Sequence, residues 1–202
     1  MARYPRSAVR VLRAGGMCVI PTDTLYGLVA RAFSKQAVAR IYALKKRSKK
    51  KPLIILISSA RDLAQFGIQA DTQTHRALSK LWPGKVSVIV PCARAQFQYL
   101  HRGTETLAFR VPKSKLLRTL LHATGPLVAP SANPEGEPPA RTVREARRYF
   151  GDEVDCYVSG GRKAGKPSTL VVLRDGWVTI LRKGIVEKSI VLAMEKGYNR
   201  KR

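Results

Sequence analysis

Short apolar runs alternate with amphipathic segments of helix length along this chain, and that alternation is what most limits its fold. The run Leu53 to Ile57 is apolar throughout and bounded by turn residues, which predicts a buried central strand. The segment from Ser34 to Leu44 repeats apolar residues every three to four positions, which predicts a helix capped by Ser34. Asp175-Gly176 separates two further apolar runs and predicts an antiparallel hairpin. Hairpins and crossovers together predict an α/β fold with a twisted sheet of mixed parallel and antiparallel strands.

The other elements follow the same two periodicities. Further strands are expected at Met17–Pro21, Val86–Val90, Thr106–Val111, Leu127–Pro130, Thr169–Leu173 and Trp177–Leu181. Further helices are expected at Asp62–Phe66, Thr72–Leu81, Lys113–Ala123 and, behind a capping box, Thr142–Phe150. We expect one domain over residues 1–202, with a core at about 8–185 and a C-terminal helix and basic tail at 186–202.

The charge balance of the chain is strongly basic. Its 202 residues include 38 lysines and arginines against 13 aspartates and glutamates, which gives a formal net charge of +25. Asp23 is the only carboxylate residue among the first 60 positions. Such an excess favours an anionic partner, with RNA or an RNA-rich particle as the first candidate. Solubility or a high-salt environment is the alternative explanation.

The sequence offers little for disulfide or metal chemistry. Cys18, Cys92 and Cys156 lie far apart and are odd in number, so buried thiols are expected instead of a disulfide framework or a zinc pattern. The three histidines also lack metal-ligand spacing. No segment approaches 18 consecutive apolar residues, and the first residues lack the apolar stretch of a signal peptide. A soluble, cytoplasmic protein without membrane contact is therefore expected.

The densest positive charge lies inside the chain, in the run Lys45 to Leu53. Six of its first seven residues are basic. Because Pro52 disfavours helix at Lys51, we expect an extended loop in which Lys45 and Arg47 point to the same side. A guanidinium group can hold a phosphate through two hydrogen bonds, and an ammonium group supplies a point charge. The run indicates either a phosphate site or a solvated basic surface.

Three further polar segments follow apolar strands, at the positions where open α/β sheets place ligands. They are residues 21–28 (PTDTLYGL), 129–136 (APSANPEG) and 160–169 (GGRKAGKPST). The first two fit either a ligand-binding wall or an ordinary capped turn. The third nearly matches a P-loop, but Pro167 stands where that motif needs Ser or Thr, and a strand follows where it needs a helix. A flexible glycine-rich loop that closes over a ligand is the remaining interpretation.

Two arginines occupy unusual positions. Arg110 lies within an otherwise apolar strand, and Arg182 ends another. Unpaired arginines are rarely buried, and carboxylates are scarce here, so an external anion is the expected partner of each. The sequence shows no Ser-His-Asp or Cys-His set and no paired carboxylates. Positioning and charge stabilisation by Lys and Arg remain, which suit phosphoryl or nucleotidyl transfer.

Taken in order, these segments resemble the YrdC family, specifically its TsaC-type L-threonylcarbamoyl-AMP synthases of the short, single-domain form. The resemblance runs from near residue 8 to about residue 185 and rests on residues 21–28, Lys45-x-Arg47, Lys51-Pro52-Leu53, Trp82-Pro83-Gly84, Arg110-Val111-Pro112, Pro130-Ser131-Ala132-Asn133, Ser168-Thr169-Leu170 and Leu181-Arg182-x-Gly184. It implies a large, positively charged concave cavity. It also implies a reaction in which L-threonine, bicarbonate and ATP give threonylcarbamoyl-AMP and pyrophosphate. Partner proteins would then transfer the threonylcarbamoyl group to the adenosine beside the anticodon of tRNA.

The resemblance also assigns roles to residues. Lys45 and Arg47 would act in catalysis. The expected ATP contacts are Arg47, Lys51, Thr106, Ser131, Asn133 and Arg182. The expected threonine contacts are Thr24, Arg110, Ala129 and Ser168. Mg²⁺ is expected on the phosphates, without a dedicated metal site or a tightly bound cofactor.

The chain departs from the family pattern at two positions. Some members carry a threonine-contacting histidine where Leu56 stands, and an ATP-contacting serine in the loop that contains Pro139. One competing interpretation is an RNA-binding or ribosome-maturation protein of the same fold without synthase activity. Relatives of uncertain activity tend to lose the asparagine of the Ser-x-Asn motif, which this chain keeps at Asn133. The other is a carbamoyl-transfer module of hydrogenase maturation, which normally lies in a much longer chain.

Overall fold

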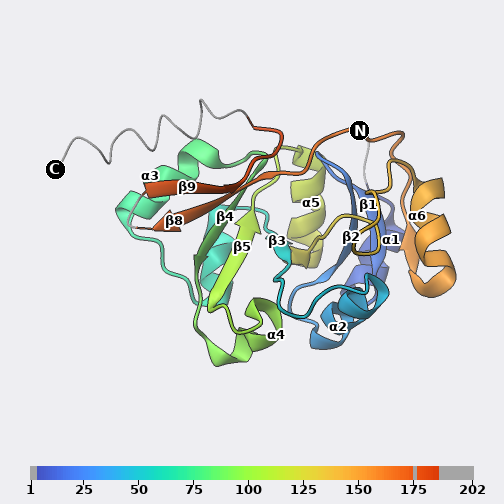
Figure 1. Ribbon diagram of the computed structural model, residues 1–202, viewed down its shortest axis with the longest axis horizontal. Coiled ribbons are helices and arrows are strands. Elements are labelled where there is room, and N and C mark those ends of the chain that lie inside the picture. Colours follow the sequence, from blue (N-terminus) through green and yellow to red (C-terminus); the bar gives the residue numbers. More distant parts are fainter. Residues whose placement is uncertain (1–3, 175–176, 187–202) are drawn as a thin grey trace.

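A nine-stranded mixed sheet forms the centre of the computed structural model, which describes residues 4–174 and 177–186 (Figure 1). The strand order is β7-β1-β2-β6-β3-β5-β4-β8-β9. Three neighbouring pairs are parallel, β1–β7, β3–β5 and β4–β8, and the others are antiparallel. The strands are β1 (Cys18–Pro21), β2 (Tyr26–Arg31), β3 (Ile54–Leu56), β4 (Val86–Pro91), β5 (Thr106–Arg110), β6 (Leu127–Val128), β7 (Cys156–Tyr157), β8 (Thr169–Arg174) and β9 (Trp177–Arg182). The predicted mixed α/β sheet is confirmed.

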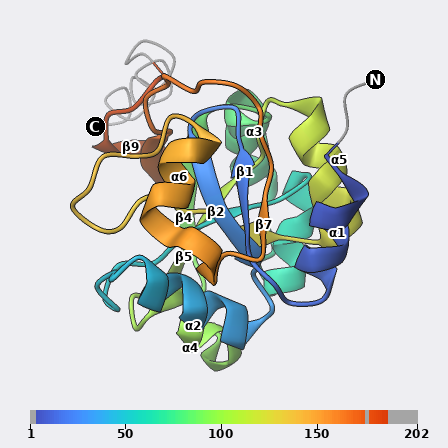
Figure 2. The same cartoon turned by 90° about the vertical axis from the view of Figure 1, so that its right-hand side faces the viewer.

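Helices cover both faces of this sheet. Figure 2 shows α1 and α5 on one side of strands β1 and β2, with α2 and α6 on the other. The α-helices are α1 (Arg6–Arg13), α2 (Lys35–Leu44), α3 (Thr72–Leu81), α4 (Gln98–His101), α5 (Lys115–Thr124) and α6 (Val143–Phe150). Short 3₁₀ segments are η1 (Ala60–Phe66), η2 (Ala95–Phe97) and η3 (Gly151–Glu153). The segment 62–66 is therefore helical as predicted, but of the tighter 3₁₀ form.

The two faces of the sheet bury two hydrophobic cores, because side chains alternate along each strand. Cys18 and Ile20 of β1 pack with Leu12 of α1 and Leu117 of α5. Val19, between them, belongs to the larger core on the opposite face, which also contains residues of α2 and α3. Each leucine or isoleucine buried in this way contributes roughly 1.5–3 kcal/mol to folding. This double coverage explains why the strands read as continuous apolar runs.

Local capping begins the helices where the sequence predicts. The Ser34 hydroxyl accepts a hydrogen bond from the Ala37 N–H at the start of α2. The Thr142 hydroxyl accepts one from the Glu145 N–H at the start of α6. The Glu145 carboxylate accepts from the Arg141 N–H, so the reciprocal half of the capping box closes one residue earlier than expected.

The basic run does not form the expected extended loop. Lys45 caps the C-terminus of α2, and Lys46 adopts a left-handed conformation with φ of 49°. The N–H groups of Lys46 and Arg47 donate to the carbonyls of Ala43 and Tyr42. This is a Schellman turn, which satisfies carbonyl groups that the end of a helix would otherwise leave unpaired. The turn places Lys45 in the interior, whereas Arg47 reaches a cavity described below.

Some elements differ from, or lie beyond, the sequence prediction. Helix α1 and strand β2 are additional to the predicted elements, because the arginines of α1 and the polar segment before Tyr26 hide their apolar positions. Cys156 is partly exposed, although three buried thiols are expected from the sequence. Strands β8 and β9 pair antiparallel as predicted. The turn at 175–176 and the expected C-terminal helix and tail beyond residue 186 lie outside the described residues.

Candidate functional site

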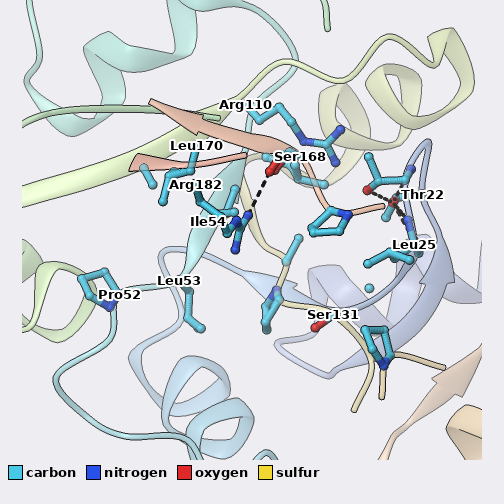
Figure 3. Close-up of a pocket in the computed structure, with 18 of the residues that line it drawn as sticks. Thr22, Leu25, Pro52, Leu53, Ile54, Arg110, Ser131, Ser168, Leu170 and Arg182 are labelled. Atoms are coloured by element: carbon cyan, nitrogen blue, oxygen red, sulfur yellow. Dashed lines mark hydrogen bonds between the residues drawn. The ribbon is translucent and has the colours of Figure 1, made fainter. Parts of the chain in front are cut away.

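A cavity of about 450 Å³ lies where strand ends and loops from distant parts of the chain meet (Figure 3). Its lining includes eight residues that the sequence singled out: Thr24, Arg47, Thr106, Arg110, Ala129, Ser131, Ser168 and Arg182. In Figure 3, Arg182 and Leu170 lie across the cavity from Thr22 and Leu25. Lys45, Lys51 and Asn133 are not among the lining residues. The structure therefore brings most of the candidate site together.

A threonine hydroxyl shapes the turn after β1. Thr22 Oγ1 accepts from the N–H groups of Thr24 (3.1 Å) and Leu25 (3.2 Å) and donates to the Leu25 carbonyl (2.6 Å). The hydroxyls of Thr22 and Thr24 lie 3.1 Å apart. Such a turn, capped by its own side chain, has its local backbone shape set within the turn itself. Both interpretations of this segment are thus compatible, because Thr22 caps the turn and Thr24 lines the cavity.

Arg110, at the end of β5, forms a buried ion pair. Its Nη1 lies 2.6 Å from Asp23 Oδ1, and the two side chains are only 5% and 9% exposed. Arg110 therefore has a partner inside the protein, and the external anion expected for it from the sequence remains a prediction. The scarcity of carboxylates along the chain did not reveal this partner, because a single carboxylate at the right place is enough to form the pair. Arg110 also lines the cavity, so part of the residue remains available to a ligand.

Arg47 and Arg182 place two more cations at the cavity. Arg47 is held by hydrogen bonds from Nε and Nη2 to the carbonyls of Lys51 (3.2 Å) and Pro52 (3.3 Å). Arg182 Nη2 donates to the Ser168 carbonyl at 3.0 Å. Burial, and then the charge of Arg47, lowers the pKa of Arg182. Two guanidinium groups that line the same cavity and repel each other are suited to share a bound anion.

Gly184 explains how β9 brings Arg182 so close to Ser168. A Cβ atom at Gly184 would lie 2.4 Å from the backbone of Pro167 and Ser168. Only glycine permits that approach of the two segments. The Arg-x-Gly pattern at this strand end is therefore a packing requirement of the cavity wall.

Lys45 supports the cavity from behind. The side chain is almost fully buried, and its ammonium group donates to the carbonyls of Ser131 (2.6 Å) and Asn133. Burial, and then the charge of Arg47, lowers the pKa of Lys45 to about 8, while Glu135 acts in the opposite direction. Lys45 thus ties the end of α2 to the Ser-x-Asn segment. Its expected role in catalysis remains a prediction.

Lys51 and Asn133 face other protein groups. Lys51 Nζ lies 2.5 Å from Glu135 Oε1, and the Lys51 side chain is 61% exposed. This pair, and then the Ser48 N–H, lowers the pKa of Glu135. The Asn133 amide donates to the carbonyls of Pro134 (2.8 Å) and Glu137 (2.6 Å), and its Oδ1 is buried without a partner among the described residues. Their contacts with ATP also remain predictions.

Ser168 is oriented by a residue that the sequence did not reveal. Its hydroxyl lies 2.8 Å from the Ser87 hydroxyl, and both serines are buried. Apolar side chains complete this part of the cavity: Leu56, Ile89, Ala108 and Leu170. Leu56 and Pro139, the two departures from the family pattern, both belong to the lining. Ser87 is the only serine within the described strands, and this polar residue inside the otherwise apolar β4 is the signal that could have found it.

The glycine-rich segment crosses beside the Thr24 turn. The hydroxyl of Tyr26 donates to the Gly161 carbonyl (2.8 Å) and accepts from the Gly160 N–H (2.9 Å). A Cβ atom at Gly165 would lie 2.3 Å from the Thr24 carbonyl oxygen. The segment therefore packs directly against the wall that carries Thr24.

The chemistry of the lining restricts what the site can do. Within residues 4–174 and 177–186, three arginines and no carboxylate line the cavity. The same residues contain no cluster of three or more His, Cys, Asp or Glu that could hold a metal ion. They also contain no helix with the length and apolar character needed to cross a membrane. Fold and site define an α/β protein whose cavity suits small anionic ligands, with a lining whose chemistry is that of positioning and charge stabilisation.

The chain belongs to the Sua5/YciO/YrdC family, whose model, described as "Telomere recombination", matches residues 10–184. A relative from Halorhodospira halophila, named threonylcarbamoyl-AMP synthase, is 34% identical over 172 residues, which cover 85% of this chain and 89% of the relative. A relative with the same name from Cellvibrio japonicus is 34% identical over 174 residues, covering 85% of this chain and 92% of that one. The family resemblance found in the sequence is confirmed.

Comparison with a solved structure agrees with this family assignment. P. abyssi Sua5 complexed with L-threonine matches with a TM-score of 0.81 and 30% identity. The match covers 89% of this chain and 53% of the Sua5 chain, so this chain spans about half the length of that protein.

Proposed function

We propose that this protein is an L-threonylcarbamoyl-AMP synthase, a nucleotidyltransferase that forms threonylcarbamoyl-AMP and pyrophosphate from L-threonine, bicarbonate and ATP. The observation that carries the proposal is one cavity that combines Thr24, Arg110 and Ser168 with two arginines whose charges interact, Arg47 and Arg182. The first group suits an amino acid, and the second suits a polyphosphate. The synthase name of relatives that match 85% of this chain supports the same reaction.

On the threonine side, Arg110 would bind the carboxylate through guanidinium N–H groups that Asp23 does not use. The hydroxyls of Thr24 and Ser168 and the backbone of Ala129 would hold the amino acid. This leaves the amino group to form a bond with the carbon of bicarbonate, with loss of water. The crystal structure of P. abyssi Sua5 in complex with L-threonine supports a threonine site on this fold.

On the ATP side, Arg47, Lys51 and Arg182 would neutralise the triphosphate. Thr106, Ser131 and Asn133 would contact the nucleotide. A carbamate oxygen would then attack the α-phosphorus and displace pyrophosphate, whose developing charge the cations stabilise. The described lining supplies no carboxylate to hold Mg²⁺, so the phosphates themselves would provide its ligands on this side of the cavity.

The test is pyrophosphate release in the presence of ATP and bicarbonate, with and without L-threonine. Release that depends on threonine, and that L-serine supports less well, is the expected result. Absence of threonine-dependent release from a folded protein that binds ATP contradicts the proposal. It would favour the competing function, an RNA-binding protein without synthase activity.

RNA contact is the second element of the proposal, because the cavity leaves most of the basic charge unused. Lys46, Lys49 and Lys50 are exposed and do not line the cavity. We infer that such residues meet tRNA in the cytoplasm, where partner proteins would take over the threonylcarbamoyl group. If several phosphates are contacted, the logarithm of tRNA affinity falls steeply with the logarithm of salt concentration. A flat dependence contradicts RNA contact and leaves the synthase proposal intact.

A further inference from the structure

Asp23 lies directly behind the wall of the cavity. Its neighbours Thr22 and Thr24 line the cavity, as does Arg110, whereas Asp23 does not. We propose that Asp23 is a positioning residue that fixes the Arg110 guanidinium and the Thr24 turn relative to each other, and so sets the affinity for the amino-acid substrate. The inference rests on the proposed function, because it concerns the same amino-acid site.

Both oxygens of the Asp23 carboxylate are engaged. Oδ1 lies 2.6 Å from Arg110 Nη1, and Oδ2 accepts from the Lys113 N–H at 2.9 Å. These two bonds connect the turn after β1 to the end of β5, 87 and 90 positions further along the chain. With both ends held, the carboxylate cannot rotate without losing a charge-assisted hydrogen bond.

Burial makes this ion pair stiff. The side chains are 5% and 9% exposed, so water screens the attraction weakly and cannot replace either partner. A guanidinium group is planar, and fixing one of its nitrogens restricts the plane in which the remaining N–H groups lie. Asp23 therefore prearranges the donors that a substrate carboxylate would meet.

The same bond also places Thr24. Asp23 is the residue immediately before Thr24, and within the turn the local bonds run to Thr22. The bond between Asp23 and Arg110 consequently fixes the distance between the Thr24 hydroxyl and the Arg110 guanidinium group, which would both contact the amino-acid substrate. Misplacing binding groups by even about 1 Å weakens a site of this kind strongly.

Asp23→Asn is the variant that tests the proposal. It keeps the shape of the side chain, removes the charge, and places an NH₂ group where Arg110 or the Lys113 N–H needs an acceptor. We expect the KM for L-threonine to rise at least about tenfold, while the Kd for ATP stays within about twofold. Isothermal titration with L-threonine alone and with ATP alone provides the same comparison without turnover. If the wild-type protein shows no synthase activity, the proposed function is refuted. The threonine affinities of the wild type and Asp23→Asn from titration would still decide the role of Asp23.

Asp155→Asn is the control outside the cavity, at a more exposed ion pair whose side chains are 41% and 38% exposed. Asp155 also pairs with an arginine, Arg40 at 3.2 Å, and also accepts a backbone N–H, from Met17 at 2.7 Å. It does not line the cavity. We expect this variant to leave the KM for threonine unchanged. An equal rise in both variants would show a general structural effect and overturn the proposal.

A double-mutant cycle separates action through Arg110 from a direct effect. If Asp23 acts through Arg110, adding Asp23→Asn to Arg110→Ala lowers kcat/KM for threonine by less than about twofold further. An unchanged threonine KM in Asp23→Asn, or a full additional tenfold loss in the Arg110→Ala background, overturns the proposal. Should Asp23→Asn fail to fold, Asp23→Glu keeps the charge but displaces it, and an unchanged KM in that variant has the same consequence.

Discussion

The buried ammonium group of Lys45 allows a quantitative test of the electrostatics behind the cavity. Lys45 is 2% exposed, and its surroundings lower the pKa from 10.5 to about 8. The variant Lys45→Met replaces the side chain by an unbranched apolar one that is a single heavy atom shorter, and removes the charge. Lys46→Met, at the exposed neighbouring position, is the control.

The sign of the effect follows from proton binding. Because the folded state holds this proton less tightly than the unfolded state, the unfolded chain binds more protons between pH 8 and 10.5. The free energy of unfolding of the wild type, relative to Lys45→Met, therefore rises with pH across this window. The shift of about 2.5 pKa units sets the full change at roughly 3 kcal/mol.

Denaturant unfolding at pH 7, 8, 9 and 10 measures this difference. Other groups that titrate in the same range cancel, because they occur in both proteins. We expect the wild-type free energy of unfolding, relative to that of Lys45→Met, to change little between pH 7 and 8. It should then rise by about 1–3 kcal/mol by pH 10, with no such trend for Lys46→Met. A difference that stays flat, or one that falls with pH, refutes the reasoning about Lys45.

Three further variants test separate parts of the cavity. Arg110→Ala should lower kcat/KM for threonine by roughly 10- to 100-fold through lost charge-assisted bonds, with little change in ATP affinity; equal loss of both contradicts its assignment. Gly165→Ala should raise the threonine KM, because the new methyl group would lie 2.3 Å from the Thr24 carbonyl oxygen, and an unchanged KM would show that the segment moves freely. Lys51→Ala should raise the ATP KM in steady-state kinetics about fivefold, and Lys50→Ala should leave it unchanged. An equal ATP KM in the two variants would contradict a contact between Lys51 and ATP.

Local signals in the sequence predicted most of the fold. The cap at Ser34, the apolar run around Ile55 and the hairpin of β8 and β9 each depend on neighbouring residues, and the structure confirms them. The same holds for the polar segments at strand ends, which do meet at one cavity. Helix α1 escaped prediction because its two buried residues, Ala8 and Leu12, are outnumbered by arginines on the exposed face.

Hydrogen bonds and ion pairs between residues far apart in the sequence could not be predicted from such local signals. Nothing local shows that Asp23 meets Arg110, or that Lys45 turns inward to carbonyls 86 and 88 positions away. The extended form expected for the basic run gave way to hydrogen bonds at the end of α2, which depend on where that helix stops. Candidate site residues could thus be named from the sequence, whereas the groups they bond within the protein could be identified only from the three-dimensional structure.

Incorporation of label from [¹⁴C]bicarbonate tests the synthase proposal most directly. The protein is incubated with ATP, L-threonine and labelled bicarbonate, and nucleotide products are separated. The proposal predicts a labelled AMP derivative that forms only when all three substrates are present, together with one pyrophosphate per product. Unlabelled AMP products that form equally well without bicarbonate, or no product from protein that binds ATP and threonine, would contradict it.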